Sequence, residues 1–317
     1  MSGSRYPFPF LVGSERSGTT LFRLMLDAHP DMAIPPESYF IVDLYRRRKR
    51  YERKGQRYNT IAVANDLAGS RWFRAWGMPP KTLATAMRRE DDVDFAEAMR
   101  KVYRGYASMH GKSRYGDKTP AYVQHIRVLA GIFPEARFVH LIRDGRNVAM
   151  SLTEVNWGPS DVLEGALQWR ERVMRGRRAG AEIGAHRYLE VRYEQLVAEP
   201  DPVLREVSEF VDLPFDDAMV RHSETAAGRI PGRPDGLHRR AATAPVAVRD
   251  WRQDMAREDL EAVEAGVGEL LSELGYDRAV PDPPQEAKRR AQVAASRRAR
   301  RHLVRRIKYF AKGNRRI

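Results

Sequence analysis

A glycine-spaced loop after the first apolar segment is the part of the sequence best suited to bind an anion. The stretch Gly13-Ser-Glu-Arg16-Ser-Gly18 follows apolar residues and precedes a helical pattern. The two glycines permit a tight backbone path, and consecutive N–H groups with the positive end of the next helix can hold a phosphate. The spacing matches the triphosphate-binding loop G-x-x-x-x-G-K-[ST], but Thr19 replaces the lysine and Arg16 carries the charge. The loop therefore predicts an anion site without a Mg²⁺-triphosphate arrangement, and a strand–turn–helix with no ligand is the alternative.

A second cationic cluster follows another apolar segment. Arg143 stands where the run Phe138 to Ile142 ends, and Ser151 lies two turns into the helical pattern that follows. Ligands of open α/β sheets bind beyond the carboxyl ends of the strands, so this cluster can face the same crevice as the first loop. A guanidinium and a hydroxyl can hold one phosphate between them. The alternative is a local ion-paired turn made by Arg143, Asp144 and Arg146.

Short apolar runs and helical patterns must position both clusters. The expected strands are residues 8–12, 138–142 and 188–191. The expected helices are residues 20–28, 94–109, 121–133, 147–154, 161–179, 201–211 and 257–274. Strands that alternate with helices of this length predict an α/β fold with a parallel sheet. The region 45–110 is expected to be a mostly helical insertion on that core.

Composition excludes several classes of protein. The chain has 317 residues with 42% hydrophobic content, which is enough for a substantial core. It has no cysteine, which excludes disulfides, thiolate metal sites and cysteine nucleophiles. No run of 18 apolar residues and no secretory pattern at the start is present, so we expect a cytoplasmic protein.

The net charge of +14 is concentrated at the end of the chain. Residues 287–317 hold 13 of the 56 basic residues and no acidic one, so the rest is almost neutral. Leu303, Val304, Ile307 and Phe310 fall near one face at helical spacing, which predicts a basic amphipathic helix. Such a helix can lie on an anionic membrane surface, bind nucleic acid or remain solvated.

Four motifs occur in order along the chain: Gly13-Ser-Glu-Arg16-Ser-Gly-Thr-Thr-Leu21, Leu26-Asp-Ala-His-Pro30, Gly116-Asp-Lys-Thr-Pro120 and Leu141-Ile-Arg-Asp-Gly-Arg-Asn-Val-Ala-Met-Ser151. Together they resemble the sulfotransferases that use 3′-phosphoadenosine 5′-phosphosulfate (PAPS), and are most similar to the tyrosylprotein-sulfotransferase-like branch, of bacterial type. The resemblance covers about the first 200 residues. It implies a three-layer, P-loop-like α/β fold with a central parallel sheet flanked by helices, and PAPS as co-substrate without a metal.

The resemblance also implies roles in donor binding. The first loop and the start of the next helix hold the 5′-phosphosulfate, and Arg143 and Ser151 hold the 3′-phosphate. Tyr193 matches a position near the adenine, and Arg239 or Arg240 matches a late basic residue that closes over the phosphates. The residues implied for the 5′-phosphosulfate are Arg16, Ser17, Gly18, Thr19 and Thr20.

Transfer of a sulfuryl group to a hydroxyl needs positive charge on the leaving oxygen, in-line placement and a base. Under the resemblance, Arg16 and Lys118 stabilise the leaving group, and Glu37 aligns with the base of this branch. Without the resemblance, Glu37 is interpreted as a helix N-cap or surface carboxylate, and Lys118 as a surface charge. His29, which precedes a proline at the end of the first helix, is expected to be structural.

The sequence thus predicts a sulfotransferase domain at residues 1–282, with the acceptor side in the insertion, and a basic tail at residues 283–317. The expected acceptor is a hydroxyl of a carbohydrate, a lipid or a small molecule. Tyrosine is less expected, because family members that sulfate secreted proteins carry a membrane anchor and no such pattern is present. The tail adds an optional peripheral contact with the inner membrane surface.

Two alternative functions are left open. One is a P-loop nucleotide kinase, although the loop lysine that such a kinase needs is missing from this chain. The other is a nucleic-acid or membrane-binding protein that binds through the tail. Nucleic acid is the less favoured partner, since it leaves the four motifs unexplained.

Overall fold

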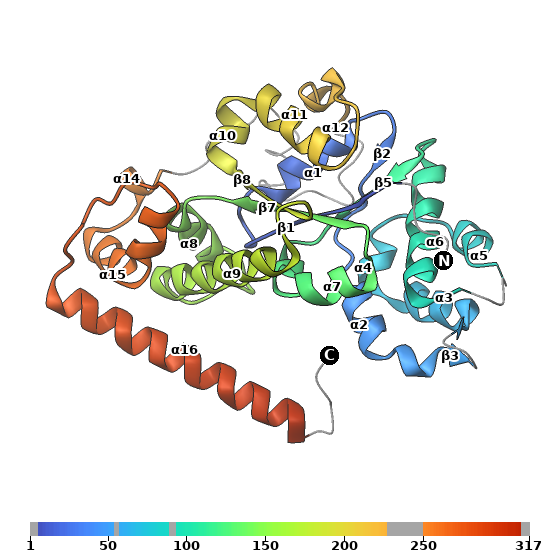
Figure 1. Cartoon of the computed structure of the whole chain (residues 1–317). Coiled ribbons are helices and arrows are strands. Elements are labelled where there is room, and N and C mark those ends of the chain that lie inside the picture. The colour runs from blue at the N-terminus through green and yellow to red at the C-terminus, as the bar shows by residue number, and fades with distance from the viewer. Residues whose placement is uncertain (1–5, 54–56, 89–92, 227–249, 312–317) are drawn as a thin grey trace. The chain divides into compact units, whose positions relative to one another are not determined.

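The computed structural model describes residues 6–53, 57–88, 93–226 and 250–311 (Figure 1). The chain divides into two compact units. The first comprises Met1–Gly13, Gly18–Ile142 and Gly176–Val246, and the second comprises Ser14–Ser17, Arg143–Arg175 and Ala247–Ile317. Each unit is described by itself.

A parallel sheet of four strands forms the centre of the first unit. Its order is β6 (Asp117–Lys118), β1 (Phe8–Gly13), β7 (Ala136–Ile142) and β8 (Tyr188–Arg192). The three longer strands confirm the sequence-based expectation to within two residues at each end. The short strand β6 is absent from that expectation because it is polar, and it pairs Asp117 with Phe10 and Lys118 with Leu11.

Helices surround this sheet within the first unit. They are α1 (Thr19–Asp27), α2 (Phe40–Arg46), α3 (Thr60–Gly69), α4 (Arg71–Arg74), α5 (Pro80–Ala86), α6 (Phe95–Met109), α7 (Ile126–Ile132), α10 (Tyr193–Ala198), α11 (Pro200–Phe210) and α12 (Ser223–Ala226). Three 3₁₀ turns are η1 (Arg48–Arg50), η2 (Pro120–Gln124) and η3 (Asp217–Met219). Two further short pairs are β2 (Met32–Ala33) with β5 (Arg114–Tyr115), and β3 (Glu52–Arg53) with β4 (Arg57–Tyr58).

The expectation of one helix over residues 121–133 is wrong. A 3₁₀ turn, η2, is followed by His125 with φ −122° and then by α7. The turn is held at Tyr122, whose hydroxyl accepts a hydrogen bond from the backbone N–H of Ile41 at 3.1 Å. This contact across 81 residues has no counterpart in the local helical pattern.

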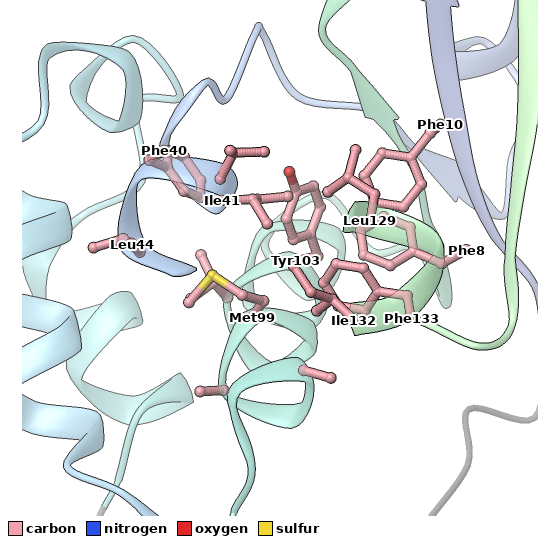
Figure 2. Packing of buried hydrophobic residues seen from close by; sticks show 14 of the residues in the cluster. Phe8, Phe10, Phe40, Ile41, Leu44, Met99, Tyr103, Leu129, Ile132 and Phe133 are labelled. Atoms are coloured by element: carbon pink, nitrogen blue, oxygen red, sulfur yellow. The ribbon is translucent and has the colours of Figure 1, made fainter. Parts of the chain in front are cut away.

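The side chains of β1 alternate between two hydrophobic clusters. Phe8 and Phe10 pack with Phe133, which directly follows α7, and with Tyr103 of α6 in one cluster, which Figure 2 shows. Leu11 faces the other cluster, which contains residues of α1 and α11. Because successive side chains of a strand point to opposite faces, the sheet lies between two helical layers. The three-layer α/β arrangement expected from the sequence is confirmed.

The second unit is helical. It contains α8 (Gly145–Thr153), α14 (Trp251–Asp254), α15 (Arg257–Glu273) and α16 (Gln285–Ala311), and α9 (Val162–Ile183) begins in it. Its hydrophobic cluster is formed by Met150, Trp251, Leu260 and Val280. No helix among the described residues is long and apolar enough to cross a lipid bilayer.

Candidate functional site

The loop between β1 and α1 has the backbone that its glycines predict. Gly18 adopts φ +91° at the N-cap of α1, a conformation that L side chains rarely adopt, and Arg16 has φ +70°. A Cβ atom on Gly13 would lie 2.6 Å from the backbone oxygen of Leu141. A non-glycine residue in the left-handed region is strained, and such strain concentrates at functional sites. The backbone of the loop therefore follows a tight path, which the two glycines permit.

Tyr193 lies directly against this loop. A Cβ atom on Gly18 would come within 2.3 Å of its ring, and the tyrosine is buried. In the same unit Thr19 is buried and Thr20 is partly buried at the start of α1, where no side chain caps the helix. The first N–H groups of a helix carry a partial positive charge. Gly18, Thr19, Thr20 and Tyr193 are thus brought together at the N-terminus of α1.

Arg16 and Arg143, two of the arginines predicted to bind the donor, are in contact in the second unit. Arg16 Nε donates to Ser151 Oγ at 3.1 Å, and Arg143 Nη1 donates to the backbone oxygen of Arg16 at 3.4 Å. Arg143 and Ser151 are both buried, as is Ser17. The structure therefore gathers Arg16, Ser17, Arg143 and Ser151 into one cluster, and a cluster of this composition can hold an anion.

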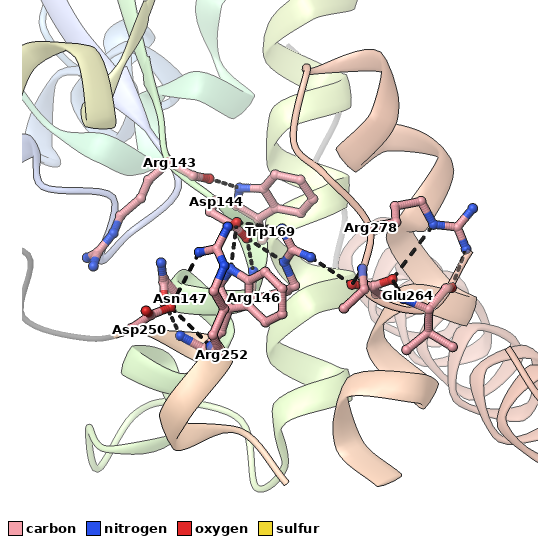
Figure 3. A network of polar contacts seen from close by, with 12 residues as sticks. Arg143, Asp144, Arg146, Asn147, Trp169, Asp250, Arg252, Glu264 and Arg278 are labelled. Atoms are coloured by element: carbon pink, nitrogen blue, oxygen red, sulfur yellow. Dashed lines mark hydrogen bonds and ion pairs between the residues drawn. The ribbon is translucent and has the colours of Figure 1, made fainter. Parts of the chain in front are cut away.

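A buried polar network adjoins this cluster within the second unit (Figure 3). Arg146 makes ion pairs with Asp144 at 2.8 Å and Glu264 at 2.7 Å, and its guanidinium lies 3.6 Å from the ring centroid of Trp251. Trp169 Nε1 donates to the backbone oxygen of Arg143 at 3.1 Å. The ion-paired turn that the sequence left open is therefore made by Asp144 and Arg146.

Glu37 and Lys118 form an ion pair in the first unit. Lys118 Nζ donates to Glu37 Oε1 at 2.9 Å, and their side chains are 5% and 28% exposed. Glu37 is therefore partly accessible whereas Lys118 is not a surface charge. The N-cap interpretation of Glu37 is wrong, because α2 begins at Phe40 with Tyr39 at its N-cap position and has no side-chain cap.

Buried hydroxyls join the two segments that carry this pair. The N–H of Ser38 donates to Thr119 Oγ1 at 2.9 Å, and the Ser38 hydroxyl contacts Tyr122 OH at 3.0 Å. Ser38 and Thr119 directly follow Glu37 and Lys118 in the sequence. These bonds consequently fix the backbone on both sides of the ion pair.

Asp117 is a fully buried carboxyl beside this pair, and sequence reasoning missed it. It accepts a hydrogen bond from Tyr103 OH at 2.6 Å. Burial raises the pKa of Asp117 to about 6, against the opposing effect of hydrogen bonds from Tyr103 and Ser38 and of the charge of Lys118. The motif that contains Asp117 was visible in the sequence, but its burial follows from the pairing of β6 with β1.

His29 and His140 are buried histidines of the first unit. His29 Nε2 lies 2.8 Å from the backbone oxygen of Pro214, and its Nδ1 accepts from the N–H of Asp31 at 3.0 Å. Burial lowers the pKa of His29, and burial also lowers the pKa of His140 to about 3. The structural role expected of His29 agrees with these contacts.

Arg239 and Arg240 lie outside the described residues. Within the described ranges, no group of three or more histidine, aspartate and glutamate side chains is arranged to hold a metal ion. Phe73 and Trp76 are core residues, whereas Trp72 is half-buried and its ring centroid lies 4.2 Å from that of Tyr39.

The parallel sheet and the glycine loop after its first strand define the class of this chain as an α/β protein of P-loop-like architecture. The sulfotransferase domain of the olefin synthase of Synechococcus PCC 7002 shares this fold, with a TM-score of 0.61 and 24% identity over 87% of this chain and 96% of that chain.

The model of the sulfotransferase family matches residues 7–217, and the chain belongs to this family. The protein-tyrosine sulfotransferase A of Caenorhabditis elegans is 26% identical over 86% of this chain and 67% of its own length. The nodulation protein NoeE of Sinorhizobium fredii is 28% identical over 88% of this chain and 69% of its own length. For the protein-tyrosine sulfotransferase of Drosophila melanogaster, the chain spans about half of the relative's length.

Proposed function

We propose that the chain transfers the sulfuryl group of PAPS to a hydroxyl of a carbohydrate, a lipid or a small molecule, with Glu37 as base. The observation that carries the proposal is the ion pair of Glu37 with Lys118, between segments that buried hydroxyls hold in place. Family membership supports the reaction class.

The donor-binding part of the proposal rests on the two anion clusters. Gly18, Thr19 and Thr20 present backbone N–H groups at the N-terminus of α1 to the 5′-phosphosulfate, and Arg16 supplies positive charge there. Arg143 and Ser151 bind the 3′-phosphate through charge-assisted and hydroxyl hydrogen bonds. The Tyr193 ring, held against Gly18, contacts the adenine. The absence of a loop lysine fits a donor that has no triphosphate.

In the reaction, the acceptor oxygen forms a bond to sulfur while the bond from sulfur to the bridging oxygen breaks. The proton of the acceptor hydroxyl passes to the Glu37 carboxylate, and the electron pair of the broken bond stays on the departing 5′-phosphate. Lys118 and Arg16 stabilise the negative charge that develops on this leaving group. Adenosine 3′,5′-bisphosphate and a sulfate ester are the products.

The acceptor is expected beside Glu37, where two aromatic rings stand. Tyr39 follows Glu37 by two residues, and its ring packs at a tilt of 32° against the half-buried Trp72. Aromatic faces bind the apolar faces of rings, which favours an acceptor with a ring near its hydroxyl. Sugars fit this description. A tyrosine phenol fits as well and is a second candidate, because several relatives are named protein-tyrosine sulfotransferases.

Calorimetric titration with adenosine 3′,5′-bisphosphate tests donor binding. We expect tight binding of the bisphosphate and weak binding of 5′-AMP and of ATP with Mg²⁺. Arg143→Ala should weaken bisphosphate binding about 10- to 100-fold, as expected for loss of a charged hydrogen bond. Arg257→Ala, which removes an exposed arginine, is the matched control and should leave binding unchanged. Equal affinity for all three ligands would contradict the assignment of PAPS as the donor.

Transfer of labelled sulfuryl from PAPS to a panel of sugars, lipids and tyrosine peptides tests the rest. Glu37→Gln should reduce kcat about 10²-fold or more with bisphosphate binding retained. Glu258→Gln, at an exposed carboxylate, is its control. Trp72→Ala should raise the KM for the acceptor and leave the KM for PAPS unchanged. A Glu37→Gln variant that turns over normally would remove Glu37 as base.

A further inference from the structure

The C-terminal helix α16 presents one face to the rest of the second unit. Ala287 and Ala291 are buried on this face, and Arg298 and His302 continue it toward the C-terminus. Arg298 pairs with Glu171 of α9 at 2.9 Å, and His302 Nε2 lies 3.1 Å from the same carboxylate. Their successive spacings of four, seven and four residues place all four side chains along one stripe of the helix. We refer to this stripe as the inner face.

The ion pair of Arg298 with Glu171 on the inner face is partly buried, with side chains 18% and 21% exposed. Burial opposes ionisation of Glu171, but Arg175 and Arg298 outweigh it and lower its pKa. Arg290, on the flank of α16, pairs with Asp259 of α15 at 2.8 Å, and Arg301 pairs with Glu164 of α9. The acidic residues of the second unit thus neutralise one side of α16 and set which side faces outward.

The opposite stripe combines cations with apolar side chains. Its residues follow one another at spacings of three or four, and they are Arg289, Val293, Arg297, Arg300, Val304 and Ile307. Val293 is 41% exposed, Val304 is 42% exposed and Ile307 is 57% exposed, and Leu303 beside them is 55% exposed. Within the described ranges, no ion pair reaches the three arginines of this stripe, which we call the outer face.

We propose that the outer face of α16 docks the protein on an anionic lipid surface, with the helix lying in the plane of the membrane. Arginine and aliphatic side chains on one stripe match such a surface, because the cations meet headgroup phosphates while the aliphatic groups enter the acyl boundary. A nucleic acid would satisfy the arginines but would give the four exposed aliphatic side chains no apolar surroundings. The proposal is independent of the sulfuryl-transfer function.

Flotation with vesicles of phosphatidylcholine, with and without phosphatidylglycerol, tests the proposal on the full chain. We expect binding that requires phosphatidylglycerol and falls with salt. Arg297→Gln with Arg300→Gln should weaken binding about 30-fold, from the contribution of each basic residue near a charged surface. Val304→Ser with Ile307→Ser changes no charge and should weaken binding about tenfold.

A charge-matched variant separates docking from general attraction. Lys288→Gln with Arg290→Gln removes the same charge from the flanks of α16, where both residues are paired with aspartates. Its loss of binding should be several-fold smaller than that of the outer-face arginine variant. Equal losses would overturn the proposal, and so would unchanged binding of the Val304→Ser, Ile307→Ser variant.

Two further measurements distinguish the other uses of this face. Helicity and bisphosphate binding of every variant should equal those of the parent chain, so a loss of vesicle binding does not report misfolding or loss of the donor site. Binding to duplex DNA or self-association that the outer-face variants abolish, in a chain that does not bind vesicles, would refute membrane docking.

Discussion

Replacing Arg146 by methionine tests the buried network beside the predicted 3′-phosphate site. The Arg146 side chain is 1% exposed, and its partners Asp144 and Glu264 are 7% and 0% exposed. Methionine keeps much of the volume of arginine and removes the charge. The two buried carboxylates then lose their common cation, and Arg278, 3.8 Å from Glu264, is the cation that remains beside that carboxylate.

The magnitude follows from the burial of these partners. Removing one partner of a buried ion pair typically costs about 3–5 kcal/mol, because an uncompensated charge remains. Here Glu264 retains the N–H groups of Ala279 and Val280, at 3.1 and 2.8 Å, and Arg278 at 3.8 Å. Asp144 retains Trp251 Nε1 at 3.0 Å and the backbone N–H of residue 146 at 2.9 Å. These remaining bonds place the expected loss near the lower limit, at about 3 kcal/mol.

Urea unfolding followed by tryptophan fluorescence and by circular dichroism measures this loss. Trp251 lies against Arg146 and is one of five tryptophans, so fluorescence includes a signal from the network and circular dichroism reports on the helices. Arg257→Met is the control: it removes an equal charge from an exposed pair with Glu261 and should cost at most about 0.5 kcal/mol. Adding Glu264→Gln to Arg146→Met should recover part of the loss, since it removes one of the stranded charges.

A loss below about 1 kcal/mol, or one equal to that of Arg257→Met, would refute the reasoning. It would mean that water reaches the carboxylates of Asp144 and Glu264, or that they become protonated at little cost. Failure of Glu264→Gln to recover any stability would also contradict the account, because it would place the loss in packing against Trp251.

Three other perturbations test the site itself. Gly18→Ala forces a Cβ atom into the Tyr193 ring at φ +91° and should weaken bisphosphate binding at least about tenfold; calorimetry that finds unchanged affinity would contradict the loop geometry. The pKa of Asp117 is raised in the folded state from 3.8 to about 6, so its stabilising contribution is present below pH 3.8 and is lost as the pH rises to 6. The free energy of unfolding of Asp117→Asn should therefore rise by up to about 3 kcal/mol relative to that of the parent between pH 4 and 7. Urea unfolding that finds the same difference between the two proteins at every pH would contradict this. Thr119→Val removes the acceptor of the Ser38 N–H and should lower kcat more than it changes bisphosphate binding; equal effects on both would argue against positioning of Glu37.

Local patterns were sufficient to predict the framework of the fold. The strands β1, β7 and β8 are apolar runs. Such a run predicts a buried strand even when the neighbouring strands of the sheet are not known. The loop of Gly13 and Gly18 was predicted for the same reason, because a tight backbone path restricts residue type at the position itself.

Contacts between distant residues decided the rest. Glu37 and Lys118 are 81 positions apart and meet because β6 pairs with β1 at Leu11. Arg146 and Glu264 are 118 positions apart, and no periodicity links them.

Charge and residue spacing are properties of the chain, so they are enough to predict that the tail is basic and amphipathic as a helix. They do not show which face of the helix points outward. That choice depends on Glu164 and Glu171, which pair with Arg298 and its neighbours only after α9 and α16 are packed in the second unit. Tertiary structure decides such questions because an ion pair forms where charges meet in space, and sequence separation carries no information about that distance.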